Sequence, residues 1–232
     1  TPPTPPSEPL IDGVSVETTQ QTDADGLTTT TVQIDPVSTG RVEDSTTPHN
    51  TLADIPLVTD ATGATLLSTG LPVGIGIQSI TQSGNDLTLR QQLINASEPR
   101  ITDDTAWQQI LSDGIDAYTA GVTAPSQVTV RTLVLTAASG SSAPGQPIVI
   151  TGARGTGEND SAHPLRQEAL IIDALTLPAG SVLSLDQVAF ALIIGETAPQ
   201  MDAAGFTQNV NMNFFSGPMM TLPVFVYDQY AY

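Results

Sequence analysis

The apolar residues of this chain occur in short runs of strand length, and turn residues separate the runs. Val14 and Val16 alternate with polar neighbours, and a threonine run between Leu27 and Ile34 ends in β-branched residues at the same period of two. The segment Asp23-Ala24-Asp25-Gly26 joins these two stretches. Alternating β-branched residues on both sides of an Asp-Gly pair predict a β-hairpin.

The same pattern predicts strands over most of the remaining chain. They are expected over residues 55–59, 64–69, 73–81, 128–136, 147–152, 169–177 and 182–194, with a last pair over 209–215 and 222–227. The two longest apolar runs, 169–177 and 182–194, are expected as central strands. The sequences Leu71-Pro72-Val73-Gly74 and Leu177-Pro178-Ala179-Gly180 are expected as turns, with proline second and glycine at positive φ.

Residues 102–119 are the one stretch with a clear helical period. Trp107, Leu111, Ile115 and Tyr118 lie on one face of such a helix, together with Ile110. A shorter helix is expected over residues 87–95. We therefore predict a helical insertion at about residues 87–119 that packs on a sheet through Trp107.

These patterns predict a mainly β fold in which antiparallel sheets pack as a β-sandwich-like domain. A partial β-solenoid is the alternative for residues 128–195, because short apolar strands separated by turns can stack. Residues 1–12 form a separate arm, in which prolines at positions 2, 3, 5, 6 and 9 favour an extended polyproline conformation. Residues 13–232 are expected to form a single β-rich domain with an aromatic-rich C-terminal strand.

The charge of the chain excludes several partners. All six cationic residues are arginines, and 24 acidic residues give a formal net charge of −18. Such a field repels nucleic acid, whose binding needs cations that displace counterions. No apolar stretch reaches the roughly 18 residues of a membrane-spanning helix, so membrane insertion is not expected. An acidic, lysine-free chain without cysteine is typical of proteins exported by bacteria.

The residues that carry chemistry are few, and we do not expect an enzyme. The two histidines, His49 and His163, lie in separate polar loops, and the absence of cysteine removes thiol nucleophiles and thiolate metal sites. Two acidic turns could supply oxygen ligands to a structural calcium ion, through Asp23 and Asp25 or through Glu158 and Asp160. Neither turn has the length of an EF-hand loop, so a plain turn is the alternative at both places. No other cofactor is expected.

Candidate interface residues lie at the two ends of the domain. Apart from Trp107 and Tyr118, every aromatic residue falls at position 190 or later. The final segment carries Phe225, Tyr227, Tyr230 and Tyr232, and aromatic residues are enriched at the centres of interfaces. We predict that these residues and the N-terminal strand with Val14 and Val16 contact a neighbouring subunit. A final strand that only closes the core is the alternative.

Several phrases follow one another in an order that is similar to a known family. They are Arg41-Val42-Glu43-Asp44, Leu52-Ala53-Asp54-Ile55-Pro56-Leu57, Leu71-Pro72-Val73-Gly74, Ala143-Pro144-Gly145-Gln146-Pro147, and Leu177-Pro178-Ala179-Gly180 followed by Val188 to Gly195. The series resembles the non-repeat region of large secreted alphaproteobacterial RTX-type calcium-binding proteins, over roughly residues 12–195. The glycine-aspartate repeats of that family are absent from this chain. The resemblance implies export and a surface role, and it transfers no catalytic residue.

Together these observations predict an extracellular or cell-surface bacterial protein with a structural role. We expect a self-assembling subunit of a surface fibre or layer, joined to copies of itself by β-strand addition. The alternative is a secreted adhesin, or a carbohydrate- or calcium-binding module, with extracellular matrix or surface polysaccharide as its partner.

Overall fold

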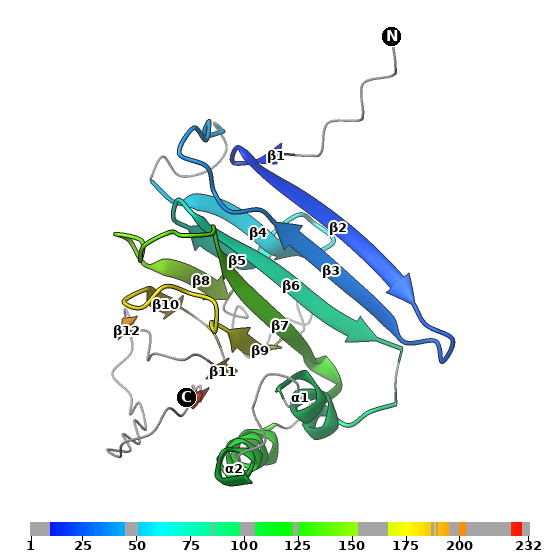
Figure 1. Cartoon of the computed structure of the whole chain (residues 1–232). Helices are drawn as coiled ribbons and strands as arrows, with labels where there is room; N and C mark the ends of the chain where they lie inside the picture. Colours follow the sequence, from blue (N-terminus) through cyan, green and yellow to red (C-terminus); the bar gives the residue numbers. More distant parts are fainter. Residues whose placement is uncertain are drawn as a thin grey trace.

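The computed structural model describes residues 10–44, 51–84, 86–97, 105–122, 125–152, 167–186, 188, 190–194, 200–202 and 224–228. These residues form an eight-stranded sheet, a five-stranded sheet and two α-helices, which confirms the predicted mainly β, sandwich-like fold (Figure 1). Within them, no helix is long and apolar enough to cross a membrane.

The eight-stranded sheet runs in the order β1 (Leu10–Ile11), β2 (Val14–Thr22), β3 (Thr28–Ile34), β6 (Ile75–Ser83), β7 (Val128–Ala137), β9 (Gln167–Asp173), β11 (Phe190–Ile194) and β13 (Val224–Asp228). The five-stranded sheet runs in the order β12 (Gln200–Asp202), β10 (Val182–Asp186), β8 (Ile148–Gly152), β5 (Thr65–Leu71) and β4 (Ala53–Thr59).

The N-terminal half of the eight-stranded sheet is antiparallel. The predicted hairpin is confirmed: β2 pairs with β3 from Val16 opposite Ile34 to Thr22 opposite Thr28. Gly26 has a φ of 84° in the turn, a value that L side chains rarely adopt. Strand β3 then pairs with β6, and β6 with β7, both antiparallel.

The C-terminal half of the chain alternates between the two sheets and forms parallel pairs in both, except that β13 pairs antiparallel with β11. Strands β7, β9 and β11 run parallel in the eight-stranded sheet, and β8, β10 and β12 run parallel in the five-stranded sheet. Each pass through one sheet is followed by a pass through the other, as in a two-sheet β-solenoid. The predicted alternative for residues 128–195 therefore describes this half, and it coexists with the sandwich.

One predicted strand is wrong. Residues 182–194 form two strands in different sheets, β10 and β11, and not one central strand. Leu183 and Leu185 of β10 and residues 191–194 of β11 are buried, and the polar pair Asp186-Gln187 separates these two apolar stretches in the sequence. The other long strand, predicted over 169–177, ends at Asp173 and is followed by a turn.

The two Leu-Pro-x-Gly sequences are turns that carry the chain from one sheet to the other. Gly74 and Gly180 have φ values of 87° and 88°, as expected. The prediction for proline is wrong by one position. The Ile75 and Ser181 N–H groups donate to the carbonyls of Pro72 and Pro178, both at 3.1 Å, so proline is the first turn residue.

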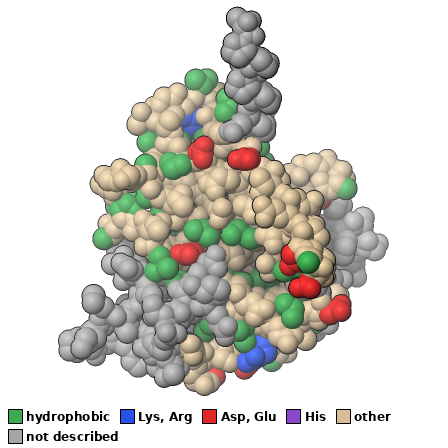
Figure 2. Space-filling view, turned by 45° about the vertical axis from the view of Figure 1, so that its right-hand side comes forward, with side chains coloured by type: hydrophobic (Ala, Val, Ile, Leu, Met, Phe, Trp, Pro, Cys, Tyr) green, Lys and Arg blue, Asp and Glu red, His purple; other side chains and the backbone are tan. Residues whose placement is uncertain are grey.

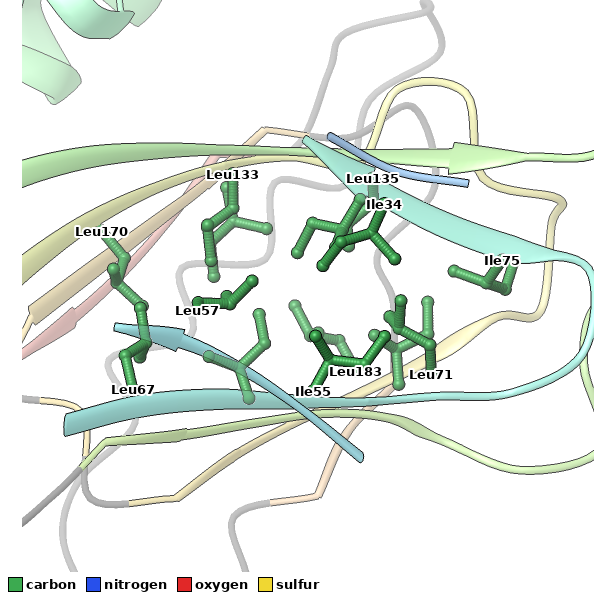
Figure 3. Packing of buried hydrophobic residues seen from close by; sticks show 14 of the residues in the cluster. Ile34, Ile55, Leu57, Leu67, Leu71, Ile75, Leu133, Leu135, Leu170 and Leu183 are labelled. Carbon is green, nitrogen blue, oxygen red and sulfur yellow. The ribbon is translucent and has the colours of Figure 1, made fainter. Parts of the chain in front are cut away.

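An apolar layer between the sheets forms the main core (Figure 3). Alternate residues of each strand point into it, as the pleat requires. Its fully buried large side chains include Ile34, Ile55, Leu67, Leu71, Ile75, Ile77, Leu133, Leu135 and Ile148. Burying one such side chain stabilises the fold by roughly 1.5–3 kcal/mol.

Two helices cover the outer face of β7, β9 and β11 and form a second core. They are α1 (Leu89–Ser97) and α2 (Thr105–Gly121), close to the predicted helical segments. Leu93 and Ile115 are fully buried against Ile171 and Leu192 of the sheet. The side chain of Trp107, predicted to anchor the helix, lies outside the described residues.

A capping box begins α1, and an ion pair joins α1 to α2. The Gln91 N–H donates to the Thr88 hydroxyl, and the Thr88 N–H donates to the Gln91 side chain, which forms a capping box before α1. Arg90 forms an exposed ion pair with Asp116 of α2. Hydrogen bonding between the Arg90 guanidinium and the Asp116 carboxylate lowers the pKa of Asp116 and raises that of Arg90. The ion pair therefore stabilises the fold at pH values above the pKa that the Asp116 carboxyl has in the unfolded chain. This stabilisation is lost as the pH falls through the lowered pKa of the folded chain.

A buried ion pair lies at one end of the inner face of the eight-stranded sheet. The Nε of Arg131 lies 3.0 Å from Oε2 of Glu168 on the neighbouring strand, and both side chains are buried. Arg131 also donates to the Ser79 hydroxyl at 2.9 Å. The side chain of Arg131 lies on the same face of β7 as that of Leu133, so the charged pair lies next to the apolar layer between the sheets.

We predict that Arg131→Met lowers the free energy of unfolding by about 3–5 kcal/mol, because it leaves the Glu168 carboxylate buried without its cation. The double variant Arg131→Met, Glu168→Met should recover most of that loss, since it removes both charges. Urea unfolding followed by circular dichroism measures both. Equal losses in the single and double variants would contradict this account of the pair.

Candidate functional site at the edge of the eight-stranded sheet

Strand β2 has a long edge that no described strand covers. Strand β1 pairs with only its first two residues, with Ile11 opposite Val14 and Leu10 opposite Ser15. From Val16 to Thr22, β3 covers one side of β2. Among the described residues, no strand lies on the other side of this segment.

The hydrogen bonds of the hairpin show which main-chain groups point outward. The Asp35 N–H donates to the Ser15 carbonyl, and the Asp23 N–H donates to the Leu27 carbonyl. Odd-numbered residues of β2 therefore face β3. Because successive residues of an antiparallel ladder face opposite sides, the N–H and C=O groups of Val16, Thr18, Gln20 and Thr22 point away from the sheet.

The chain's own N-terminal sequence cannot supply the missing ladder. Continued in the register of β1, it would place Pro9, Pro5 and Pro3 opposite three of the four outward-facing residues. Proline has no N–H to donate and is found in sheets at edges or bulges. The outward carbonyls of β2 would therefore lack donors along most of this edge.

The free part of β2 is also exposed on both faces. Val14 and Val16 point into the apolar layer, with 4% and 8% of their surface exposed, whereas residues 17–22 are all exposed. Figure 1 shows β2 and β3 extending past β4 and β5. Cross-strand hydrogen bonds from Gln20 to Thr30 and between Thr22 and Thr28 hold this extension together.

The corresponding edge of the five-stranded sheet is different. Strand β4 pairs only with β5 among the described strands, and it carries Pro56 in its centre. Its register shifts between Pro56 and Val58 and again between Val58 and Thr59. Proline and bulges are features that prevent edge-to-edge pairing. Strand β2 has neither, and its segment from Thr18 to Thr22 carries no charge.

An ion-pair network fixes the start of β2. Asp12, in the turn between β1 and β2, is fully buried, and its Oδ2 lies 2.6 Å from Nη1 of Arg41. Its carboxylate also accepts the N–H groups of Asp44 at 3.2 Å and Asp54 at 2.9 Å. Arg41 donates to the Leu52 carbonyl at 2.9 Å. This Asp12 network joins three distant segments of the chain at one point.

The network depends on an unusual backbone turn. Asp12 and Gly13 have φ values of 48° and 72°. A Cβ at Gly13 would lie 2.3 Å from the Val42 carbonyl oxygen, so only glycine fits there. No local charge pattern predicts this pairing, in which the sequences around Arg41 and Asp54 meet at Asp12.

The predicted interface residues lie at both ends of the eight-stranded sheet. The side chains of Val14 and Val16 belong to the core, and it is the main chain of β2 that reaches the surface. Phe225 and Tyr227 lie in β13, the last strand at the opposite end, opposite Ile193 and Ala191 of β11. Tyr230 and Tyr232 lie outside the described residues.

The predicted calcium ligands are only partly described. The Asp23 carboxylate accepts the N–H groups of Asp25 and Leu27, each at 2.9 Å, and thereby closes the hairpin turn. Glu158, Asp160, His49 and His163 lie outside the described residues. In the part of the chain that the structure describes, no three His, Asp or Glu side chains are grouped so that they could hold a metal ion. Structural calcium stays a prediction.

Comparisons of the chain with protein-family models, with curated proteins and with solved structures found no match. The β2 edge is the feature of the described structure that points most directly to a function. In Figure 2, which turns this side of the molecule forward, uncharged polar side chains and backbone cover much of the surface, and acidic side chains gather in a few small groups among hydrophobic ones.

We predict that Asp12→Ala lowers the free energy of unfolding by about 3–5 kcal/mol, because it removes the fully buried carboxylate that pairs with Arg41. Glu43, which also pairs with Arg41, is partly exposed and should compensate for little of the loss. Asp25→Ala is the matched control, since Asp25 is exposed in the hairpin turn and its loss should change stability by less than about 0.5 kcal/mol. Urea unfolding of both variants provides the measurement. Similar losses at the two positions would contradict a special role for Asp12.

Proposed function

We propose that this protein is an extracellular structural component of a bacterial surface that joins to copies of itself by β-strand addition. The observation that supports this most directly is the uncovered β2 edge, because its main-chain donors and acceptors point outward in an exposed, proline-free strand. An added strand satisfies such groups and extends the sheet from one molecule into the next.

The ends of the eight-stranded sheet allow an assembly that does not close. Strands β1 and β2 lie at one end and β13 at the other. A contact between two β2 edges and a different contact between two β13 edges would alternate along a row of molecules. Because each contact uses its own axis, the row continues as a fibre or layer.

Each contact of this kind is weak alone. A main-chain hydrogen bond contributes about 0.5–1.5 kcal/mol after exchange with water. The loss of free motion on association opposes it by roughly 4 kcal/mol or more. We therefore expect assembly to depend strongly on protein concentration, and to be favoured where many copies accumulate at one surface.

The charge of the chain argues against a nucleic acid as the partner. Arg41 and Arg131 are buried in ion pairs, and Arg90 is paired with Asp116. These arginines, the three whose side chains are described, therefore already have acidic partners inside the molecule. A patch that binds phosphates needs cations that are free to replace counterions.

We predict that the wild-type chain associates as its concentration rises and that Gln20→Pro abolishes the association. The substitution removes an outward-facing N–H, whereas Gln20→Ala keeps it and should associate like the wild type. Sedimentation velocity between micromolar and millimolar concentrations measures association, and negative-stain images show whether ordered rows form.

Thermal unfolding by circular dichroism checks that both Gln20 variants remain folded. A wild-type chain that stays monomeric throughout, with and without calcium, would contradict the proposal. If such a monomer bound surface polysaccharide or melted in a calcium-dependent way, the secreted adhesin or binding module would be favoured instead.

A further inference from the structure

We infer that two copies of this chain pair through antiparallel β2 strands, with Gln20 of one copy opposite Gln20 of the other. The inference rests on the proposed self-association and specifies the partner strand, its direction and its register. It is carried by the register of β1, by the direction of the outward main-chain groups and by the charges around the free edge.

The register of β1 sets where the free edge begins. Leu10 lies opposite Ser15, so β1 occupies this side of β2 as far as the residue before Val16, and a strand from another molecule that reached Val16 would meet the end of β1. The outward groups that stay accessible belong to Thr18, Gln20 and Thr22. These three residues are placed symmetrically about Gln20. An identical strand that runs in the opposite direction therefore supplies a hydrogen-bonding partner for each outward N–H and C=O group. Thr18 then pairs with Thr22 of the second copy, and Gln20 with Gln20.

The direction of the groups also favours the antiparallel arrangement. In an antiparallel ladder, two residues that face each other exchange both of their hydrogen bonds. In a parallel ladder, each outward-facing residue forms its hydrogen bonds with the two residues that flank the one opposite it. Two identical β2 strands could therefore pair in parallel only if one were shifted by one residue along the other. That shift destroys the two-fold symmetry of the contact. An isologous contact between two β2 edges is therefore antiparallel.

Charge limits the contact at both ends and leaves its centre neutral. The segment from Thr18 to Thr22 has no charged residue in a chain whose net charge is −18. In the inferred register, Glu17 of each copy lies beside Asp23 of the other. Like charges in such positions destabilise strand pairing. The contact should tighten as salt screens them, because the Debye length falls to about 10 Å at 0.1 M.

Cysteine cross-linking tests the register directly, because the natural chain has no cysteine. Facing residues of a hydrogen-bonded antiparallel pair have Cα atoms about 5.5 Å apart, within the range that a disulfide spans. Gln20→Cys should therefore form a covalent dimer under mild oxidation. Thr19→Cys and Gln21→Cys should each cross-link poorly alone and well when mixed, because position 19 lies opposite position 21. Ser139→Cys, in an exposed turn away from β2, measures random collision.

The outcomes separate the register from the proposed function. Cross-linking by Gln20→Cys and by the mixed pair, with Thr19→Cys alone at the level of Ser139→Cys, supports the inference. Thr19→Cys that cross-links efficiently alone overturns it, since the axis would then pass through Thr19. No cross-linking above Ser139→Cys in a chain that still associates by sedimentation also overturns it, while the proposed function stands. A monomeric chain without specific cross-links contradicts both.

Glu17→Gln offers a second readout that leaves the main chain unchanged. We expect about two- to fivefold tighter association at low salt, the range typical of one surface charge pair, and little difference at 0.5 M salt. Thr29→Ala, on the neighbouring strand, is the control and should associate like the wild type. An unchanged affinity for Glu17→Gln at low salt would count against the inferred position of Glu17 beside Asp23.

Discussion

The extent of the apolar layer between the two sheets determines most of what this molecule can do. Among the described residues, eight strands on one side face five on the other, so the smaller sheet cannot cover the larger one completely. Alternate residues of β2 are apolar only as far as Val16, and β6 changes from Ile77 to Ser79 and Thr81 on the same face. Beyond these points hydrophobic burial no longer holds the sheets together. The strands continue as a polar extension that cross-strand pairs and main-chain ladders stabilise.

This extension gives β2 its free edge, and the Asp12 network fixes where that edge begins. A buried carboxylate is tolerated only with hydrogen bonds and an opposite charge, and Asp12 has both. The backbone around Asp12 has little conformational freedom, because the turn also requires glycine with a positive φ at position 13. The network therefore sets the register of β1 against β2 as well as stabilising the domain. A register shift of one residue would turn every side chain of β1 to the other face.

The sequence predicted local structure well and long-range pairing poorly. The hairpin around Asp23 and the capped helix at Leu89 depend on residues a few positions apart, and both were predictable from period and turn chemistry. Asp12 contacts residues that lie 29 to 42 positions away in the chain, and no local pattern encodes such a contact. The run from Val182 to Ile194 was misread because strands in two different sheets both face buried layers. Periodicity reports burial, and it does not report which sheet a strand joins.

The candidate site was predicted only in part for the same reason. Val14 and Val16 were expected to contact a neighbour, yet their side chains are needed inside the core. The groups that remain available on β2 are peptide N–H and carbonyl groups, which every residue carries and which side-chain patterns do not reveal. Such groups suit an acidic chain, because they bind a copy of the same molecule without a complementary charge. Proline near the N-terminus and in β4 disfavours pairing beside β1 and at β4, whereas the segment of β2 from Thr18 to Thr22 has neither proline nor charge and can extend its sheet.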